Sequence, residues 1–330
     1  MLEHILIKRY NFYMAKIRKY YCKKRNSKYN WDNVKSYRFS PSLFIHNLLP
    51  LCCKFKKEEF LATDNKNTLG FLATKLVKGV NTRIKIEELT FAEDCYDAAK
   101  QLIEFVISYY GAKGATSFFV KVSDVYSGLL NLFVSQYNFR QCSYEKLWRV
   151  SRRKYEELDY NLNIRSFRNS DAASVALMHN EALISHFRPS LSLTTKSFKE
   201  SWFKGLQSLV EYRYIIEDEK SSNILAYVSI SSKDNENYIL DIIQTSWYQA
   251  PLDNIIAFAC AEIKKRNLNF NLFVKSKKYT VTGIDYEEFF ANNKFLQSQT
   301  SVLLVKDYYN TVNQNNESGK FVMLGHQLSY

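Results

Sequence analysis

The chain has 330 residues, of which 46% are hydrophobic and 15% are aromatic, so it is long and apolar enough for two buried cores and is not globally disordered. Its net charge is +13, but residues 1–40 hold eleven basic residues against two acidic ones, so most of the charge belongs to an N-terminal arm. No run of eighteen apolar residues and no C-x-x-C or H-E-x-x-H spacing occurs, which argues against a membrane-spanning helix, a disulfide framework and a zinc site. We expect reduced cysteines and a cytoplasmic location.

In chain order, the first half begins with the basic, Tyr-rich arm of residues 1–40, which we expect to be helical as far as Lys24. Ser40-Pro41-Ser42 breaks the chain before an apolar, helix-like stretch. Alternating and helical apolar spacings then predict three strands, a helix, a strand, a helix and a closing strand, at residues 59–62, 69–75, 83–91, 94–110, 116–122, 126–136 and 146–150.

The second half follows a charged linker at residues 152–157. It should open with a strand at 162–167 and a helix at 172–184, for which Asn169-Ser170-Asp171 supplies N-cap chemistry. The remaining expected elements are helix, three strands, helix, strand, helix and strand, at residues 195–205, 212–217, 224–231, 238–245, 252–266, 269–274, 286–292 and 300–306. Residues 310–330 have the composition of a flexible tail.

Three sequence anchors repeat at a nearly constant offset. Phe118-Phe119-Val120-Lys121-Val122 matches Leu272-Phe273-Val274-Lys275-Ser276 with an offset of 154 residues. The pairs Asn138-Phe139 and Lys294-Phe295, and the runs that begin at Leu147 and Leu303, are each 156 residues apart. Because the same elements recur in the same order, the sequence predicts a duplicated domain. The order in the second half predicts an α/β fold in which each half has a mixed central sheet flanked by helices.

This element order resembles that of the GNAT superfamily of N-acetyltransferases, in the form of bacterial tandem proteins with two such domains. In the second half the resemblance rests on Asn163-Ile164-Arg165 with Asp171, on residues 273–279, and on the ending from Phe295 to Lys306. In the first half it rests on Leu69-Gly70-Phe71, on residues 111–115, and on Asn138-Phe139 before Trp148-Arg149. The implied domains are residues 41–154 and 155–312, between the arm (1–40) and the tail (313–330).

The resemblance implies transfer of an acetyl group from acetyl-CoA, as co-substrate, to an amine of an unidentified acceptor. In the family, a loop of the form Q/R-x-x-G-x-G/A binds the pyrophosphate at a helix start. The matching loop of the second half has Gln249 in the first position, but Leu252 and Asn254 replace the glycines. The loop of the first half, residues 91–97, has three acids and no glycine, which predicts a non-catalytic copy.

The same resemblance suggests site residues in the second half. Tyr279, after the fifth strand, would be the general acid, and Asp241, in the fourth strand, would lie near the acyl group and could act as a base or face solvent. Cofactor-binding residues would be Thr245, Trp247, Gln249 and Asn254. Weaker candidates are Tyr137, the counterpart in the first half, and a group that borders the acceptor cleft, namely His179, Glu181 and His186.

Two other functions compete with the enzyme. The chain could be a scaffold or regulator that kept the fold and lost the cofactor loop. It could also be an RNA- or ribosome-associated protein, because basic and aromatic residues interleave within residues 8–28 and would suit phosphates and stacked bases, or an anionic membrane surface. A solvated helix packed through its aromatic side is the simplest interpretation of the arm.

Overall fold

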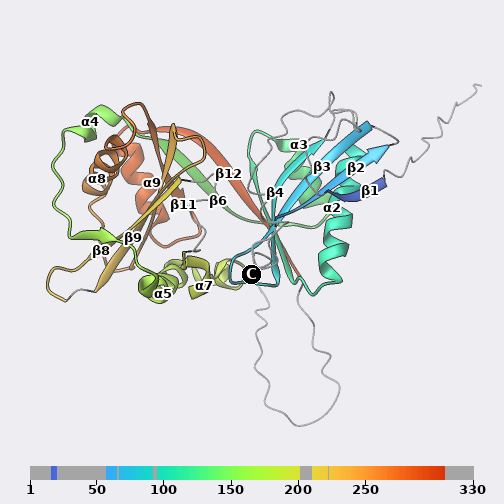
Figure 1. Cartoon of the computed structure of the whole chain (residues 1–330), viewed down its shortest axis with the longest axis horizontal. Helices are drawn as coiled ribbons and strands as arrows, with labels where there is room; N and C mark the ends of the chain where they lie inside the picture. The colour runs from blue at the N-terminus through green and yellow to red at the C-terminus, as the bar shows by residue number, and fades with distance from the viewer. Residues whose placement is uncertain are drawn as a thin grey trace, which may run out of the picture.

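The protein consists of two lobes that share one sheet, as the computed structural model in Figure 1 shows. The structure describes residues 16–20, 57–64, 67–91, 95–200, 210–221 and 223–308. Two long strands, β6 (Arg140–Arg149) and β12 (Leu296–Asp307), cross between the lobes. Among the described residues, no helix is both long and apolar enough to cross a membrane.

Among the described residues, the first half contributes five further strands and three helical segments. The strands are β1 (Lys16–Tyr20), β2 (Lys57–Asp64), β3 (Asn67–Leu76), β4 (Arg83–Phe91) and β5 (Ser117–Ser123). The helical segments are α2 (Tyr96–Gly111), α3 (Ser127–Asn131) and the π-helical turn η2 (Leu132–Gln136). In α2 the buried residues recur every three or four positions, which places one apolar face on the sheet.

The second half contains the complete element order that the sequence predicted. Its strands are β7 (Ile164–Ser166), β8 (Val210–Glu217), β9 (Ile224–Ser232), β10 (Asn237–Gln244) and β11 (Asn271–Lys277). Its main helices are α5 (Ala172–Ala182), α8 (Leu252–Lys264) and α9 (Gly283–Asn292). Shorter segments are α4 (Arg152–Glu156), η3 (Asn169–Asp171), η4 (Ser185–Phe187), α6 (Arg188–Leu191) and α7 (Thr195–Phe198).

Three sequence-based expectations need correction. The arm is not helical at Lys16–Tyr20, which forms the edge strand β1 and pairs antiparallel with β2. The charged linker folds into the short helix α4, where Arg152 pairs with Glu156 one turn later. The helix that begins at Thr195 ends at Phe198, because Lys199 adopts an extended conformation. The other residues of the arm, the stretch 43–51 and the tail 313–330 lie outside the described residues.

The two halves exchange their last strands. The sheet order is β1-β2-β3-β4-β5-β12-β6-β11-β10-β9-β8-β7. Strand β12, from the end of the chain, pairs with β5 of the first half, and β6, from the first half, pairs with β11 of the second. Strands β6 and β12 also pair with each other, antiparallel, at the centre. The sheet therefore continues from one half into the other without an edge between them.

The repeated anchors occupy equivalent places in the two halves. Asn138 and Lys294, 156 residues apart, both adopt the left-handed backbone conformation, with φ of 53° and 57°. Each directs a following Phe into a core, where Phe139 is 1% exposed and Phe295 is 8% exposed. Positive φ is rare outside glycine, so its occurrence at both positions supports a structural duplication.

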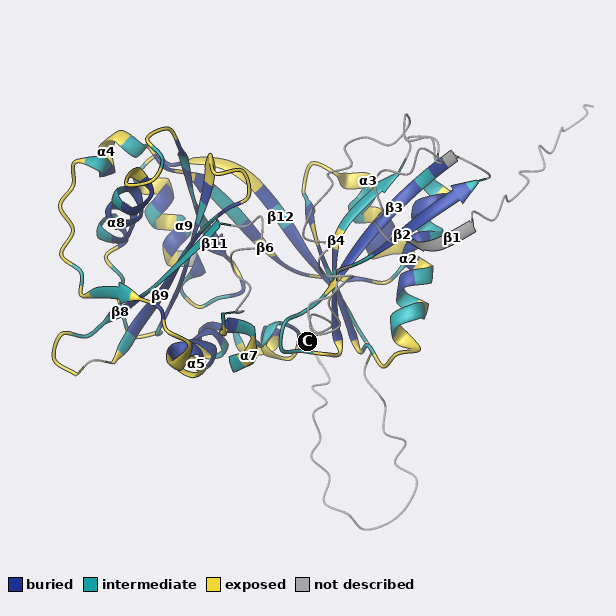
Figure 2. Ribbon diagram, viewed as in Figure 1, coloured by how far each residue is buried: buried dark blue, intermediate teal, exposed yellow. Residues whose placement is uncertain are grey.

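Among the described residues, four apolar clusters join the sheet to the helices on its two faces. Figure 2 shows the buried residues of the strands and of the helices in dark blue. On one face, α8 and α9 pack over β10 and β11, and α2 packs over β4 and β5. On the other face, α5 packs over β9 and β10, and a smaller cluster around Leu303 and Tyr279 lies where the halves meet. The second face is the one that carries the candidate site.

Candidate functional site

Within the part of the chain that the structure describes, each half has a parallel strand pair that diverges. Strands β10 and β11 pair over four residues, up to Leu240 and Val274, and both then continue without pairing to each other. Strands β4 and β5 likewise pair over four residues, up to Ile86 and Val120. Divergence of a parallel pair opens the sheet locally, so each half has a place where an extended ligand can lie between strands.

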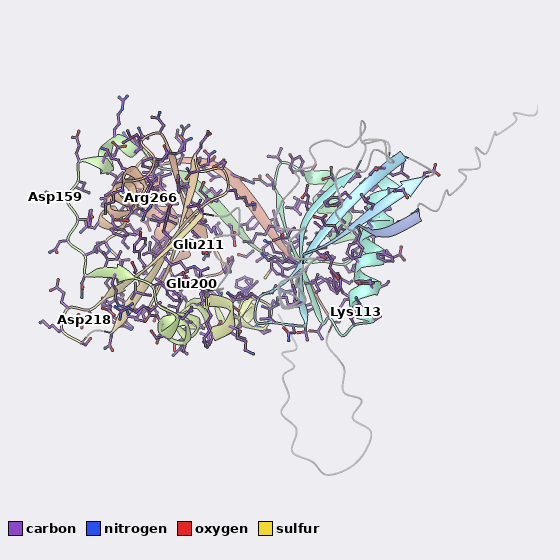
Figure 3. All side chains as sticks on the ribbon, in the orientation of Figure 1. Lys113, Asp159, Glu200, Glu211, Asp218 and Arg266 are labelled. Carbon is purple, nitrogen blue, oxygen red and sulfur yellow. The ribbon has the colours of Figure 1, made fainter. Side chains whose placement is uncertain are left out.

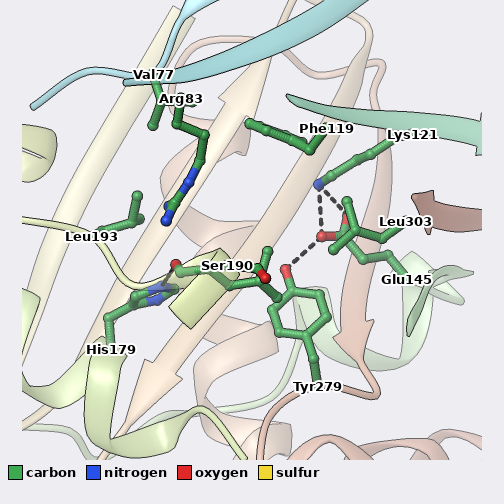
Figure 4. A pocket seen from close by; sticks show the side chains of 11 residues that line it. Val77, Arg83, Phe119, Lys121, Glu145, His179, Ser190, Leu193, Tyr279 and Leu303 are labelled. Carbon is green, nitrogen blue, oxygen red and sulfur yellow. Dashed lines mark hydrogen bonds and ion pairs between the residues drawn. The ribbon is translucent and has the colours of Figure 1, made fainter. Parts of the chain in front are cut away.

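A cavity of about 160 Å³ lies on the second face of the sheet, where the halves meet. Figure 4 shows its side chains converging from both halves, with Arg83 and Tyr279 on different walls. Strands β4, β5, β6 and β12 and the segment around α5 and α6 contribute to it. The lining residues are Val77, Arg83, Phe119, Lys121, Glu145, His179, Ser190, Leu191, Leu193, Tyr279 and Leu303.

Tyr279, Glu145 and Lys121 form a connected group on one wall. The Tyr279 hydroxyl donates to Glu145 Oε1 at 2.5 Å, and Lys121 Nζ lies 2.6 Å from both oxygens of the same carboxylate. Burial opposes ionisation of Glu145, but the ammonium groups of Lys121 and Lys275 outweigh it and lower the pKa of Glu145 to about 2. Glu145 is therefore a carboxylate at neutral pH.

Burial raises the pKa of Tyr279 well above its ordinary value, and the nearby Glu145 carboxylate raises it further. The phenol therefore stays protonated across the physiological range. Its side chain is only 7% exposed and lines the cavity. Because its proton is donated to Glu145, the Tyr279 oxygen is available to a ligand as a hydrogen-bond acceptor in this structure, while Glu145 holds the orientation of the ring.

His179 is a buried, neutral residue of the cavity wall. Burial, together with the positive charge of Lys277, lowers the pKa of His179 to about 4. Its Nε2 lies 3.4 Å from the Leu191 carbonyl oxygen, which orients the ring. Its two neighbours in the sequence-based group lie elsewhere on the surface, because Glu181 is exposed and His186 packs on Phe187.

Arg83 is a buried cation that, within the described residues, donates its hydrogen bonds to backbone oxygens, while the Asp307 carboxylate acts on its charge. Its Nη1 donates to the Ser192 carbonyl at 2.8 Å and its Nη2 to the Pro189 carbonyl at 3.1 Å. The residue is 7% exposed, and its Nε is buried without a hydrogen-bond partner among the described residues. These contacts connect β4 of the first half to the α6 segment of the second.

Asp241 lies in β10 where β10 and β11 diverge, and it is held by two lysines. Lys275 Nζ lies 3.0 Å from Oδ2, and Lys277 Nζ lies 2.6 Å from Oδ1. Burial would raise the pKa of Asp241, but these two cations hold it below its ordinary value. Asp241 does not line the cavity. In this structure it bridges the two diverging strands and is a poor proton acceptor.

The predicted cofactor residues lie together, between β10 and the first turn of α8. The Thr245 N–H already donates to the Leu225 carbonyl, at 3.1 Å. Trp247 and Gln249 are exposed, and Asn254 is partly buried in the first turn of α8. Leu252, which replaces a glycine of the family pattern, points into the core and is 7% exposed.

At the repeat offset of 154 residues, the equivalent of Tyr279 in the first half is Val125, so the repeat itself does not supply a second tyrosine. Tyr137, the counterpart considered for Tyr279, donates its hydroxyl to the Lys100 carbonyl at 2.7 Å. Of the acidic loop at residues 91–97, the described part contains Asp97, which pairs with Lys100 on the surface. The rest of that loop lies outside the described residues.

Sequence reasoning missed four polar residues of the cavity: Arg83, Lys121, Glu145 and Ser190. Arg83, Lys121 and Glu145 come from β4, β5 and β6 of the first half, and Ser190 comes from α6 of the second, so the set is assembled where the halves meet. One signal was available, since Lys121 is part of the repeated Phe-Val-Lys segment and its equivalent, Lys275, also lies close to a carboxylate. Within the described residues, no group of three or more His, Cys, Asp or Glu side chains is arranged to hold a metal ion.

Comparison with solved structures of the same architecture identifies the fold. A tandem GNAT protein from the clavulanic acid biosynthesis pathway superposes with a TM-score of 0.53 at 9% sequence identity, over 77% of this chain and 83% of that one. The present chain has a tandem GNAT fold. A GCN5-related N-acetyltransferase from Sphaerobacter thermophilus gives a TM-score of 0.52 at 10% identity, over 80% of this chain and 84% of that one. Neither a protein-family model nor a curated protein matches the sequence.

In terms of the GNAT fold, the expected mixed sheet with flanking helices and the tandem organisation are confirmed. Strands β10 and β11 occupy the positions of the fourth and fifth strands of that element order, α8 follows the fourth strand, and Tyr279 follows the fifth. The cavity lies beside α5 and α6, which correspond to the region that the resemblance assigned to the acceptor.

Proposed function

We propose that the chain is an acyl-CoA-dependent N-acyltransferase whose second half binds the acyl donor and whose central cavity receives an amine acceptor. One observation carries the proposal: the parallel pair β10–β11 diverges after Leu240 and Val274, and Tyr279, at the end of the diverging β11, points into a cavity. The donor would enter between the strands, and the acceptor would reach it from the second face.

The loop before α8 has donors that fit a pyrophosphate. By helix geometry, the N–H groups of Leu252, Asp253 and Asn254 have no partner inside the helix, and the helix dipole favours an anion there. Because the Leu252 side chain is turned into the core, it does not occupy the space that the missing glycine would leave open. Gln249 is exposed beside these groups and can donate from its amide.

The donor would supply an acyl thioester. The chain's own residues would position the acceptor amine and stabilise the leaving thiolate. The neutral amine of the acceptor attacks the thioester carbonyl, the C–S bond breaks, and the departing thiolate takes a proton. The Tyr279 hydroxyl would stabilise that thiolate by turning its proton from Glu145, to which it donates in this structure, toward the sulfur. The proton lost by the amine would leave through water, because Asp241 is held by Lys275 and Lys277 and Glu145 by Lys121.

A second candidate function is a scaffold that has the fold without acyl transfer. Two features favour it. Pro251, the residue before α8, has no N–H, and the Tyr248 N–H donates to the Thr245 carbonyl, which reduces the donors of the loop. Asp253 also places a carboxylate in the first turn of α8, although the Tyr155 hydroxyl donates to it at 2.9 Å.

The two candidates differ in whether acetyl-CoA binds and reacts. If the enzyme proposal holds, acetyl-CoA raises the thermal midpoint of the full chain by mass action, and a panel of small amines yields free thiol. A matched control is the variant Gln249→Glu with Asn254→Asp, which adds negative charge beside the α8 start and should abolish the shift. Absence of any shift at millimolar acetyl-CoA would overturn the enzyme and leave the scaffold. If acetyl-CoA raises the thermal midpoint but no amine of the panel releases free thiol from it, a cofactor-binding regulator would be favoured.

Residues 8–28 could also contact nucleic acid or an anionic surface, and this contact stays a proposal. Only Lys16–Tyr20 of that segment belongs to the described residues. Since this strand pairs with β2, deletion of the whole arm would also remove an edge of the sheet. The appropriate test therefore replaces the basic residues at positions 23–28 with Gln, outside β1. Unchanged, salt-insensitive retention on nucleic acid would count against the contact.

A further inference from the structure

The charged groups on the cavity wall already have partners within the chain. Lys121 Nζ lies 2.6 Å from the Glu145 carboxylate, with which it forms an ion pair. Both Nη atoms of Arg83 donate to backbone carbonyls of the α6 segment, and the Asp307 carboxylate acts on the Arg83 charge. The Arg83 Nε is buried and does not face the cavity. Among the described residues, the wall therefore offers no unpaired cation to an acidic ligand.

The polar hydrogens beside the Lys121–Glu145 pair are also engaged. The Tyr279 hydroxyl donates to the Glu145 carboxylate at 2.5 Å, and the Ser190 hydroxyl donates to a second carboxylate at 2.8 Å. His179 Nε2 lies 3.4 Å from a backbone carbonyl oxygen, so the hydrogen of the neutral ring belongs on Nε2 and a lone pair on Nδ1. On this wall, the Tyr279 oxygen is left as a hydrogen-bond acceptor, and a ligand that binds to it has to bring a donor.

The rest of the cavity lining is hydrocarbon. In Figure 4, Val77 and Leu193 lie on one side of the cavity and Tyr279 on the other. The apolar side chains of the lining are Val77, Phe119, Leu191, Leu193 and Leu303. A ligand that fills this space therefore has hydrogen-bond donors at one end and an apolar body at the other.

We propose that the central cavity binds a small primary amine with an uncharged hydrocarbon body, and that the amine donates an N–H to the Tyr279 oxygen. The assignment rests on the proposed acyltransferase function for the role of this ligand, but not for its binding. The cavity volume of about 160 Å³ is close to the roughly 150 Å³ of an engineered apolar cavity that holds a benzene molecule. The expected ligand is therefore an amine of about that size.

An amine that also has a carboxylate fits this cavity poorly. Its carboxylate would lose its water among the apolar side chains without gaining a free cation. It would also meet the field of Glu145, which stays ionised because lysines hold its pKa at about 2 against the effect of burial. Charge thus selects against amino acids, and volume selects against long amines.

The arrangement also assigns a role to the tandem organisation. Val77 and Phe119 belong to the first half, whereas Leu191, Leu193 and Tyr279 belong to the second. The first half, which lacks a recognisable cofactor loop, would thus supply part of the apolar pocket for the acceptor. The amine nitrogen would lie beside Tyr279, where the acyl group is expected.

The test compares three probes of equal size on the full chain without acetyl-CoA, so that it is independent of acyl transfer. Isoamylamine has an amine on a branched hydrocarbon, isovaleronitrile has the same carbon skeleton without an N–H donor, and β-alanine has the amine with a carboxylate. In titrations followed by ligand-observed NMR, isoamylamine should bind about fivefold or more tightly than isovaleronitrile. It should bind about tenfold or more tightly than β-alanine.

Two variants locate the bound amine. Tyr279→Phe should weaken isoamylamine binding about fivefold and leave isovaleronitrile binding unchanged. Val77→Phe places a ring in the apolar side of the cavity and should abolish isoamylamine binding, whereas Val125→Phe, the same change at an exposed position, should preserve it.

The proposal would be overturned if isoamylamine does not bind at millimolar concentration, or binds no better than isovaleronitrile or β-alanine. Undiminished isoamylamine binding by the Val77 variant would overturn the location. The comparison of probes on the unmodified chain depends on no variant. If isoamylamine binds as expected but acetyl-CoA neither binds nor reacts, the amine pocket stands and the acyltransferase function fails.

Discussion

Glu145 of β6 and Ser301 of β12 lie opposite each other in the central antiparallel pair, and they are 156 residues apart, which is the offset of the sequence repeat. The two residues are equivalent positions of the two halves, so the approximate twofold axis that relates the halves passes between them. Around it, the equivalent lysines Lys121 and Lys275 both lower the pKa of Glu145. Because the acid is present on one strand only, the duplicated scaffold has a single, asymmetric carboxylate at its centre.

The hydrogen bond from Tyr279 to Glu145 can be tested by Tyr279→Phe. Loss of the hydroxyl leaves a buried carboxylate with one donor fewer, so the free energy of unfolding should fall by about 1–3 kcal/mol in chemical denaturation. If Tyr279 stabilises the leaving thiolate, kcat for acyl transfer should fall about 100-fold or more while the affinity for acetyl-CoA is kept. Tyr126→Phe, at an exposed position, is the control and should change neither quantity. Normal kcat in the Tyr279 variant would exclude the acid role.

The lowered pKa of Glu145 predicts an acid-dependent stability. Its folded-state pKa of about 2 lies below the ordinary value of 4.5, so its stabilising contribution is fully present above pH 4.5 and is lost as the pH falls toward 2. The loss is at most about 3 kcal/mol. Glu145→Gln should flatten this part of the unfolding free energy plotted against pH, whereas the exposed control Glu157→Gln should not. An unchanged pH profile in the Glu145 variant would show that other acids dominate.

The turn between β11 and α9 should tolerate no side chain at Gly283. A Cβ at this position would lie 1.9 Å from the Lys277 carbonyl oxygen, which is backbone and has little freedom to move. Gly283→Ala should therefore cost about 2 kcal/mol or more and should shift Tyr279, which lies within the same turn. Gly111→Ala is the matched control, because a Cβ there meets nothing within 4 Å, and alanine should be neutral or slightly stabilising. Equal thermal midpoints of the two variants would contradict the turn geometry.

The exchange of β6 and β12 predicts that the halves cannot be separated by cutting the connection between them. A protease site placed at residues 158–161, between α4 and β7, should leave the two fragments together on a sizing column after cleavage, because each contributes a central strand to the other. In contrast, fragments 1–154 and 155–330 expressed singly should be poorly soluble, and co-expression should restore a folded complex. Separation of the cleaved halves under native conditions would contradict the exchange.

The order of helices and strands could be predicted from the sequence. Which strands pair with each other at the centre of the sheet could not. Strand β11 is equivalent to β5, and β12 to β6, so the edge of each half has a similar pattern and accepts either closing strand. Apolar periodicity cannot distinguish these two pairings, because both bury the same faces. Tyr279 could be placed from the element order alone. Arg83 could not, because it reaches the cavity only through contacts between the halves.

The helix predicted for the arm failed at Lys16–Tyr20 for a related reason. Its mixture of basic and large apolar or aromatic residues is compatible with both a helix and an edge strand, and pairing with β2, more than thirty residues later, decides for the strand. Long-range pairing overrode a local preference. At the diverging end of β10 the sequence left open whether Asp241 faces solvent or acts as a base, and the structure pairs it with Lys275 and Lys277.

The exchanged strand β12 also affects how the protein is made. During synthesis the first half emerges without β12, so its native sheet stays incomplete until residues 296–307 leave the ribosome, and until then either β5 or an equivalently paired β6 forms the exposed edge. An exposed strand edge of this kind pairs readily with other chains. Premature termination between residues 150 and 295 should therefore yield an aggregation-prone fragment and not a folded single domain. Solubility of the protein thus depends on translation of the full chain.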